Sequence, residues 1–349
     1  MSNNKEILLV GHWSFHMYEE SFAKGLTRAG CNVIKFSLSK YSLKFHFLNY
    51  YLNLFKIRKI NSDIQLQLKS SKANYLFLWN DVPVFPKTLK IAKLYGVKVV
   101  TYTNDDPFKS RSILQTRNIR NLYSFYWYRK FIKFSDVNFV YRAINLQEIE
   151  KFAPKSKNFI LMPYFVPDVH YPLNFSLRDC KRDVIFIGHY EDDQRVEYIN
   201  YLLEKGIDIQ IFGAGWEKAK DLIINGSLKD IKVMEKHNYT LELSRSRICL
   251  CFLSKLNRDE YTRRCFEIPA MKKILVSEYS HALNKIYRDG EEAVYFKSKE
   301  DLLKKVKDLL SNPREIDRIA ENGYKKCLNE GFDVYSISRD FIRKVDEVL

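Results

Sequence analysis

The residues best suited to chemistry lie in one stretch, 257–278. Arg263 and Arg264 follow a polar loop at the predicted start of a short helix, near Thr262, and an apolar strand is predicted after that helix. Free backbone N–H groups and the positive end of a helix attract phosphate, and arginine offers a planar donor fork that matches its geometry. Glu267 follows one turn later, where its carboxylate could accept the two hydroxyls of a ribose. The stretch therefore predicts a nucleotide site, with places for a diphosphate and a ribose.

The same spacing has a simpler explanation. Arg263 and Glu267 are four residues apart and could form an ion pair on a helix surface, which contributes about 0.2–0.5 kcal/mol. The residue types alone leave both interpretations open.

Two glycine turns are further candidates for binding phosphate. Gly188 and His189 come after a predicted buried strand and before a helix, and Gly213 follows the next strand. Glycine lets the backbone approach a diphosphate closely, so the N–H of Gly188 is a candidate donor. A structural turn is the alternative for each. The full Gly-x-Gly-x-x-Gly pattern is missing, which disfavours a dehydrogenase-type dinucleotide fold.

Candidate bases follow two predicted strands of the first half. His12 and His16 come after the first strand, and either could accept a proton near neutral pH. Asp105 and Asp106 end a later strand, at an edge where ligands usually bind. Plain loop histidines are the alternative for the first pair, and Mg²⁺ ligation is an alternative for the second. A third acidic pair, Asp192-Asp193, is predicted to stabilise a helix start instead.

The net charge of +16 is unevenly distributed along the chain. Residues 1–175 hold 26 Lys and Arg against 11 Asp and Glu, whereas residues 176–349 hold 32 against 31. Aromatic and basic residues alternate densely in 41–59 and 122–134. Such a surface suits an anionic membrane or a nucleic acid, and a solvated basic helix face is the alternative. We recognise no nucleic-acid-binding motif, so a nucleic-acid partner is not expected.

Length and composition favour an ordinary two-domain globular protein of 349 residues. No apolar run is long enough to span a bilayer, and the N-terminus is too short for a signal peptide before the first strand, so a cytoplasmic location is expected. The cysteines show no metal-site spacing and are expected to be reduced core residues: Cys31, Cys180, Cys249, Cys251, Cys265 and Cys327.

The elements that must position these residues form two similar halves. In each half, short apolar strands alternate with amphipathic helices, which predicts parallel α/β sheets. A proline-rich stretch without periodicity, 163–175, separates them. We therefore expect two doubly wound Rossmann-like domains, 1–168 and 172–334, facing across a cleft. The last helix, 335–349, is expected to pack back on the first domain.

Several motifs give the chain a family resemblance. The second half resembles the CgeB-like (spore maturation protein) glycosyltransferases, which belong to the GT-B superfamily and carry a C-terminal domain of the glycosyl transferases group 1 type. The first half is similar more loosely. The matching segments are Asp183–Gly188, Phe212–Trp216, Arg264–Ala270, Ile274–Ser277, Asp289–Phe296, Asn312–Glu315 and Ile319–Gly323, and, in the first half, Asp105–Pro107, Leu161–Pro163 and His170–Pro172.

The resemblance implies roles for individual residues. The second domain would hold a nucleotide-sugar donor and the first domain an acceptor. Glu267 matches the ribose-binding acid, Arg264 a diphosphate contact and Gly188 the diphosphate loop. The first position of the family's Glu-x7-Glu motif falls on Asp259, a shorter acid. The remaining donor-site residues expected around these are His189, Gly213, Tyr261 and Thr262, whereas Lys272-Lys273 replace the small residues usual in the family.

The expected function is transfer of a hexosyl or related sugar to a hydroxyl of a surface glycan, such as lipopolysaccharide or capsule, or of a lipid-linked acceptor. The resemblance implies no bound metal and no cofactor other than the nucleotide-sugar substrate. An inverting reaction would need a base, for which His16 and Asp105 are preferred over His12 and Asp106. Peripheral association with the inner face of the cell membrane is a further expectation. The alternative is a non-catalytic glycan- or nucleotide-binding module.

Overall fold

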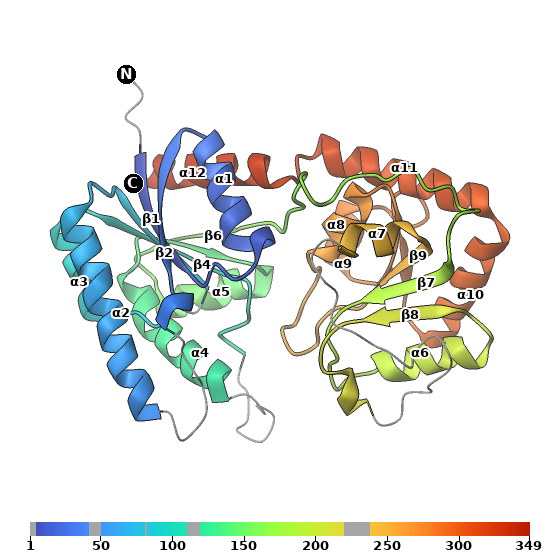
Figure 1. Cartoon of the computed structure of the whole chain (residues 1–349), viewed down its shortest axis with the longest axis horizontal. Coiled ribbons are helices and arrows are strands. Elements are labelled where there is room, and N and C mark those ends of the chain that lie inside the picture. The colour runs from blue at the N-terminus through green and yellow to red at the C-terminus, as the bar shows by residue number, and fades with distance from the viewer. Residues whose placement is uncertain (1–4, 42–49, 81, 110–118, 220–237) are drawn as a thin grey trace. The chain divides into compact units, whose positions relative to one another are not determined.

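The computed structural model describes residues 5–41, 50–80, 82–109, 119–219 and 238–349. The chain divides into two compact units (Figure 1). Unit 1 comprises residues 1–162 together with Val334–Leu349, and unit 2 is Pro163–Asp333. The two parallel-sheet α/β units that the alternating pattern predicts are confirmed.

Unit 1 contains a six-stranded parallel sheet in the order β2-β1-β3-β4-β5-β6. Its middle strands are apolar runs because helices cover both faces of a parallel sheet. The strands are β1 (Lys5–Gly11), β2 (Cys31–Ser37), β3 (Tyr75–Trp79), β4 (Lys98–Thr103), β5 (Val137–Val140) and β6 (Lys157–Ile160).

Two layers of helices enclose this sheet (Figure 1). One layer is α1 (Ser21–Arg28), which a π-helical turn (His16–Glu20) precedes, together with α12 (Val334–Val348). The aromatic rings of Phe22 and Phe341 pack there against Phe77 of β3. The other layer is α2 (Tyr50–Ser70), α3 (Pro86–Leu94), α4 (Ile119–Phe131) with the short helix Ile132–Phe134, and α5 (Ala143–Phe152). Part of the predicted aromatic-basic run 41–59, residues 42–49, lies outside the described residues.

Unit 2 contains a five-stranded parallel sheet in the order β11-β10-β9-β7-β8. The strands are β7 (Arg182–Ile187), β8 (Ile209–Phe212), β9 (Ser246–Cys251), β10 (Ile274–Glu278) and β11 (Val294–Phe296). The helices are α6 (Arg195–Glu204), a short turn at Trp216–Lys218, α7 (Tyr239–Ser244), α8 (Arg264–Ala270), α9 (His281–Ile286), α10 (Lys299–Ser311) and α11 (Pro313–Asn329).

The proline-rich stretch is bonded into unit 2. Phe165 donates its N–H to the carbonyl oxygen of Phe332, and the hydroxyl of Thr240 donates to the carbonyl of Val169. His170 is 1% exposed, so its side chain lies inside this unit. The stretch therefore contributes to the core of unit 2 near α7 and α8.

Lys272 marks the turn from α8 into β10. Its φ of 56° is in the left-handed region that favours glycine, which explains why a small residue suits this position. Its ammonium group forms an ion pair with Glu321 of α11 at 2.6 Å. Lysine therefore adds a contact that glycine could not make.

Candidate active site

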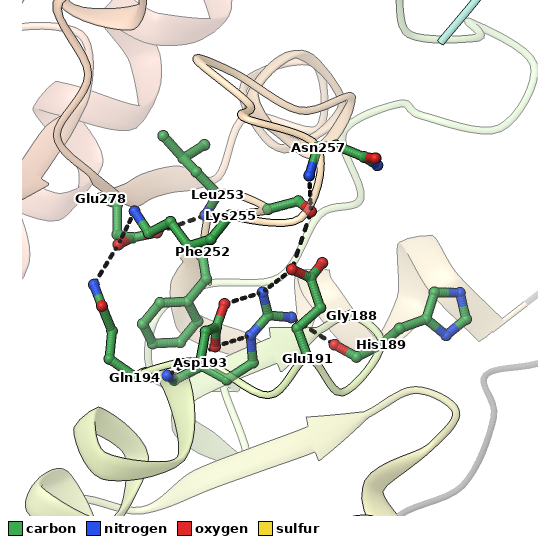
Figure 2. Close-up of polar contacts among 12 residues, drawn as sticks. Gly188, His189, Glu191, Asp193, Gln194, Phe252, Leu253, Lys255, Asn257 and Glu278 are labelled. Carbon is green, nitrogen blue, oxygen red and sulfur yellow. Dashed lines mark hydrogen bonds and ion pairs between the residues drawn. The ribbon is translucent and has the colours of Figure 1, made fainter. Parts of the chain in front are cut away.

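The strand order of unit 2 locates a candidate site. From β7 the chain passes first to β8 on one side and later to β9 on the other, so the order reverses at β7 and β9. In open parallel sheets, ligands bind outside the carboxyl ends of the strands at such a reversal. The loops there are Gly188–Gln194 after β7 and Phe252–Asn257 after β9, and Glu278 ends the neighbouring strand β10 (Figure 2).

Arg195 organises the loop after β7. Its guanidinium is 3% exposed and donates to both carboxylate oxygens of Asp193, at 2.7 and 2.8 Å, and to the carbonyl of His189 at 2.6 Å. The Asp193 carboxylate also accepts the N–H of Arg195, the first residue of α6, which agrees with a role for this acid at a helix start. The imidazole of His189 is exposed and points away from this network (Figure 2).

Glu278 binds the neighbouring loops together (Figure 2). Its Oε1 accepts from Gln194 Nε2 at 3.1 Å and from Lys255 Nζ at 2.9 Å, and its Oε2 accepts the N–H of Leu253 at 2.7 Å. A second link runs from Ser254, whose hydroxyl donates to Glu191 at 3.0 Å. The rim of the candidate site is therefore fixed by polar contacts before any ligand binds.

The two predicted phosphate-binding glycines contact each other. The N–H of Gly188 is donated to the carbonyl of Phe212 at 2.8 Å, and its own carbonyl accepts from the indole of Trp216 at 2.9 Å. A Cβ on Gly213 would lie 1.9 Å from that carbonyl oxygen. The expectation that the Gly188 N–H donates to a diphosphate is therefore corrected, because strand β8 already uses it. These glycines are needed for the close approach of two backbone segments.

Glu267 lies at the centre of a buried cluster. It is 5% exposed, and its Oε2 accepts from the Tyr239 hydroxyl at 2.8 Å. Its Oε1 is 3.2 Å from Arg263 Nε and 3.8 Å from His170 Nε2. Burial would raise the pKa of Glu267, but attraction to the protonated form of His170 and to Arg263, together with the tyrosine hydrogen bond, holds that pKa below its usual value.

This arrangement combines the two interpretations of 257–278. Arg263 and Glu267 do form an ion pair, but it is buried within unit 2 and not on a helix surface. A ribose that binds this carboxylate would share it with Tyr239, Arg263 and His170. The ribose-binding role of Glu267 stays a prediction.

The start of α8 carries the remaining predicted donor-site residues. Tyr261 and Thr262 are 5% and 7% exposed, and the ring of Tyr261 packs against Phe266. The hydroxyl of Thr262 lies between two thiols, 3.5 Å from Cys251 Sγ and 3.8 Å from Cys265 Sγ.

The two thiols beside this hydroxyl also contact each other. The Cys265 thiol lies 3.9 Å from Cys251 Sγ, and this hydrogen bond lowers the pKa of Cys251 to about 6, with the positive charge of Arg264 acting in the same direction. Asp259 is half-buried in the preceding loop, where its N–H is donated to the carbonyl of Ser254. The charge of Arg264 therefore acts on the Cys251 thiol at this end of α8, and the role of Arg264 in binding a diphosphate stays a prediction.

His170 provides a test of this cluster through pH. Burial lowers the pKa of His170 to about 4, and its Nδ1 accepts the N–H of Val166 at 2.9 Å, so the ring is neutral at pH 7. An unfolded histidine has a pKa near ~6.5, so the unfolded chain binds more protons between about pH 6.5 and 4. We expect the free energy of unfolding to fall by about 3 kcal/mol across this window on account of this group. Asparagine keeps an acceptor for Val166, so His170→Asn should remove that fall in urea titrations at several pH values.

The exposed His281 on α9 gives a matched control in the same unit. His281→Asn should leave the pH dependence as it is in the parent protein. An unchanged fall in the His170→Asn variant would contradict a neutral, buried His170.

The four candidate bases lie at the carboxyl edge of the sheet in unit 1. His16 Nδ1 is 3.3 Å from the carboxylate of Glu20, and the backbone N–H of His12 is held by the buried Glu19 at 2.9 Å. Asp106 is 0% exposed, and its Oδ1 accepts from the Asn145 side chain at 2.9 Å and from two backbone N–H groups.

These contacts favour a structural role for Asp106. Asp105 is half-buried beside it and stays a candidate together with His16. In the parts of the chain that the structure describes, no group of three or more His, Cys, Asp or Glu side chains could hold a metal ion. The described helices likewise include none with the length and apolar character needed to cross a bilayer.

Comparison with known proteins adds to this geometry. Residues 195–335 match a family described as glycosyl transferase-like. No curated protein matches the sequence. Among solved structures, sucrose-phosphate synthase from Thermosynechococcus elongatus aligns with a TM-score of 0.73 at 9% identity and covers 98% of each chain. A glycosyltransferase from Rickettsia africae aligns with a TM-score of 0.68 at 13% identity, over 99% of each chain. HepE from Anabaena, solved with UDP-glucose, aligns with a TM-score of 0.64 at 10% identity, over 98% of this chain and 99% of that one.

The chain has the GT-B fold. The predicted fold class is thereby confirmed, and the segment that matches the glycosyl transferase-like family covers most of unit 2. The narrower CgeB-like resemblance stays a prediction.

Sequence reasoning missed four residues that shape this GT-B unit. Glu278 and Arg195 bind the rim, and His170 and Tyr239 surround Glu267. The signal for Arg195 was the run of acids just before it, and Glu278 follows the strand that we predicted. His170 lies in a segment of the family resemblance, but no local signal joins it or Tyr239 to Glu267, because that partner is distant in the chain.

Proposed function

We propose that this protein is a glycosyltransferase that moves a sugar from a nucleotide diphosphate donor to an acceptor hydroxyl. The match of residues 195–335 to a glycosyl transferase-like family carries the proposal, because this segment contains Arg264, Glu267 and the site rim formed by Glu278. The position of that rim at the strand-order reversal of unit 2 supports it.

The donor would bind at the carboxyl edge of unit 2. HepE has been solved with UDP and with UDP-glucose, so a uridine nucleotide is the first donor to test. Arg264 would contact the diphosphate and the exposed His189 would donate to it. Glu267 would bind the ribose, and Asp259, Tyr261 and Thr262 would complete the surroundings of the donor.

The chemistry requires stabilisation of the departing diphosphate, which gains negative charge as the bond to the sugar breaks. Arg264 and the positive surroundings of α8 would supply it, without a metal or a further cofactor. If the anomeric centre is inverted, His16 or Asp105 of unit 1 would accept the proton of the acceptor hydroxyl. If configuration is retained, no such base is required, so the anomeric configuration of the product decides whether these residues matter.

The acceptor is proposed to be a growing surface glycan or a lipid-linked precursor, as in lipopolysaccharide or capsule assembly. Unit 1, which would bind it, is strongly basic. Anionic lipids concentrate in the cytoplasmic leaflet and attract basic protein surfaces. We therefore propose that the protein works at the inner face of the cell membrane.

A thermal-shift screen of nucleoside diphosphates tests the donor site. At a hundredfold excess over Kd, one nucleotide should raise the unfolding midpoint of the parent protein by about 5 °C or more. His189→Ala should weaken that nucleotide about tenfold or more, since a hydrogen bond to a charged group is lost. The exposed Lys304→Ala in α10 is the control and should bind normally.

Turnover distinguishes the enzyme from the alternative, a non-catalytic nucleotide- or glycan-binding module. The departure at Asp259 from the family's Glu-x7-Glu pattern favours that alternative. Release of nucleoside diphosphate from the matching nucleotide-sugar would establish the enzyme. Binding without release, across acceptors, would establish the module, and no response to any nucleotide would overturn the proposal.

A further inference from the structure

The whole net charge of the protein belongs to unit 1. Residues 1–162 and Val334–Leu349 contain 29 Lys and Arg against 13 Asp and Glu. Unit 2 contains 29 of each kind and is neutral. A charge confined to one folding unit points to a partner of that unit, since solubility alone would not require such segregation.

Within unit 1 the charge gathers on one layer of helices. We define the α2–α4 layer as Tyr50–Ser70, Pro86–Leu94 and Ile119–Phe134, and α3 contacts both α2 and α4 (Figure 1). These segments hold 11 Lys and Arg but a single acid, Asp63, whose carboxylate accepts a hydrogen bond from Tyr41 at 2.7 Å. Helix α12 on the opposite face of the sheet is balanced, with three basic and three acidic residues.

Large apolar side chains are exposed on the same layer. On α2, Phe55 is 68% exposed and Leu66 is 63% exposed, although the opposite side of this helix is buried in the core. Leu94 at the end of α3 is 83% exposed, and Tyr126 on α4 is 51% exposed.

Basic residues accompany these apolar ones along the helix surfaces. Arg58 and Lys59 lie one turn after Phe55 and are exposed, and Lys69 follows Leu66 by three residues. The guanidinium of Arg58 lies 6.0 Å from the ring of Phe55. Exposed apolar residues beside lysine and arginine, without acids, are the composition of helices that lie in a membrane interface.

We propose that the α2–α4 layer docks unit 1 on an anionic lipid bilayer. Phe55, Leu66 and Leu94 would enter the boundary between headgroups and acyl chains, and the surrounding lysines and arginines would pair with lipid phosphates. A nucleic acid would satisfy the charges but offers no apolar phase for exposed leucines. The inference rests on the membrane part of the proposed function and is independent of the transfer reaction.

Vesicle flotation of the full chain tests this assignment. The parent protein should float with vesicles of phosphatidylcholine containing phosphatidylglycerol and remain unbound with pure phosphatidylcholine. Binding should fall as salt rises, because charge pairing with the surface is screened. Absence of binding to anionic vesicles at low salt would overturn the proposal.

Paired variants locate the surface. The double variant Arg58→Glu/Lys59→Glu should lower the affinity for anionic vesicles roughly tenfold or more. The double variant Phe55→Ser/Leu66→Ser should lower the vesicle binding that remains at high salt, because that binding comes from apolar contacts. Lys304→Glu/Lys307→Glu on α10 changes the net charge equally but lies in unit 2, so it should bind as the parent does. Equal loss in both charge variants would mean that net charge alone acts, and would overturn the assignment.

Two further measurements keep the outcomes separate. The docking variants should retain the nucleotide-induced thermal shift, so failure of docking and failure of the donor site are distinguishable. Tighter binding to a duplex oligonucleotide than to anionic vesicles, lost in Arg58→Glu/Lys59→Glu, would assign the layer to nucleic acid and overturn the membrane proposal.

Discussion

Replacing Glu267 with alanine is expected to destabilise unit 2 by about 3–5 kcal/mol. The carboxylate is buried between Arg263, Tyr239 and His170, so its removal takes an acceptor from the Tyr239 hydroxyl and the paired negative charge from Arg263. Urea unfolding at pH 7 measures the loss. The fold holds the pKa of the Glu267 carboxyl below its pKa in the unfolded chain, which is about 4.3. The stability that this carboxylate contributes is therefore fully present above about pH 4.3 and is lost as the pH falls through its pKa in the folded protein.

Two control variants make this result interpretable. Glu321 forms exposed ion pairs with Lys272 and Lys325, so Glu321→Ala should cost about 0–1 kcal/mol. Glu267→Gln keeps an acceptor for Tyr239 and removes the charge, so it should fall between the two. Equal unfolding midpoints for Glu267→Ala and the parent protein would contradict a structural role.

The glutamine variant also tests the ribose-binding role. A folded Glu267→Gln protein that has lost its nucleotide-induced thermal shift would assign Glu267 to the donor. If the variant keeps its nucleotide-induced thermal shift, Glu267 has only a structural role, in which it joins α7, α8 and the 163–175 stretch.

Replacing Gly213 with alanine is expected to cost about 3–5 kcal/mol, the sum of overpacking and backbone strain. The new Cβ would lie 1.9 Å from the carbonyl oxygen of Gly188 and 3.1 Å from the indole nitrogen of Trp216. Gly188 belongs to the loop after β7 and Trp216 to the turn after β8, and the Gly188 oxygen is backbone that no side-chain rotation can move. Chemical denaturation of the folded variant, or its loss from the soluble fraction, measures the effect.

Gly206→Ala separates strain from the clash. Gly206 has a φ of 79° and no atom within 4 Å of an added Cβ, so only the backbone strain of about 1–2 kcal/mol is expected. Equal costs for the two alanine variants would show that the approach of Gly213 to Gly188 is not tight in solution.

Local pattern was enough to predict much of this protein. Alternating short strands and amphipathic helices indicate parallel α/β units, and a polar loop before Arg264 indicates the helix that follows β9. The strand Ile274–Ser277 was predicted within one residue of β10 (Ile274–Glu278) because its apolar run is bounded by charged residues. These features depend on neighbours in the chain, so the sequence determined them by itself.

The contacts that define the site depend on residues that are distant in the chain. Glu267 meets Tyr239, 28 residues earlier, and His170, and it is these partners that make the carboxylate buried. Gly188 meets Trp216, also 28 residues away, which turns an apparent phosphate loop into a packed crossing of two segments. No local pattern predicts which buried side chains contact one another, because those contacts depend on how the strands and helices pack. Neighbours along the chain therefore fix the fold class and predict 257–278 as the donor site, whereas the packing of distant segments decides which polar groups of that stretch already have partners within the protein.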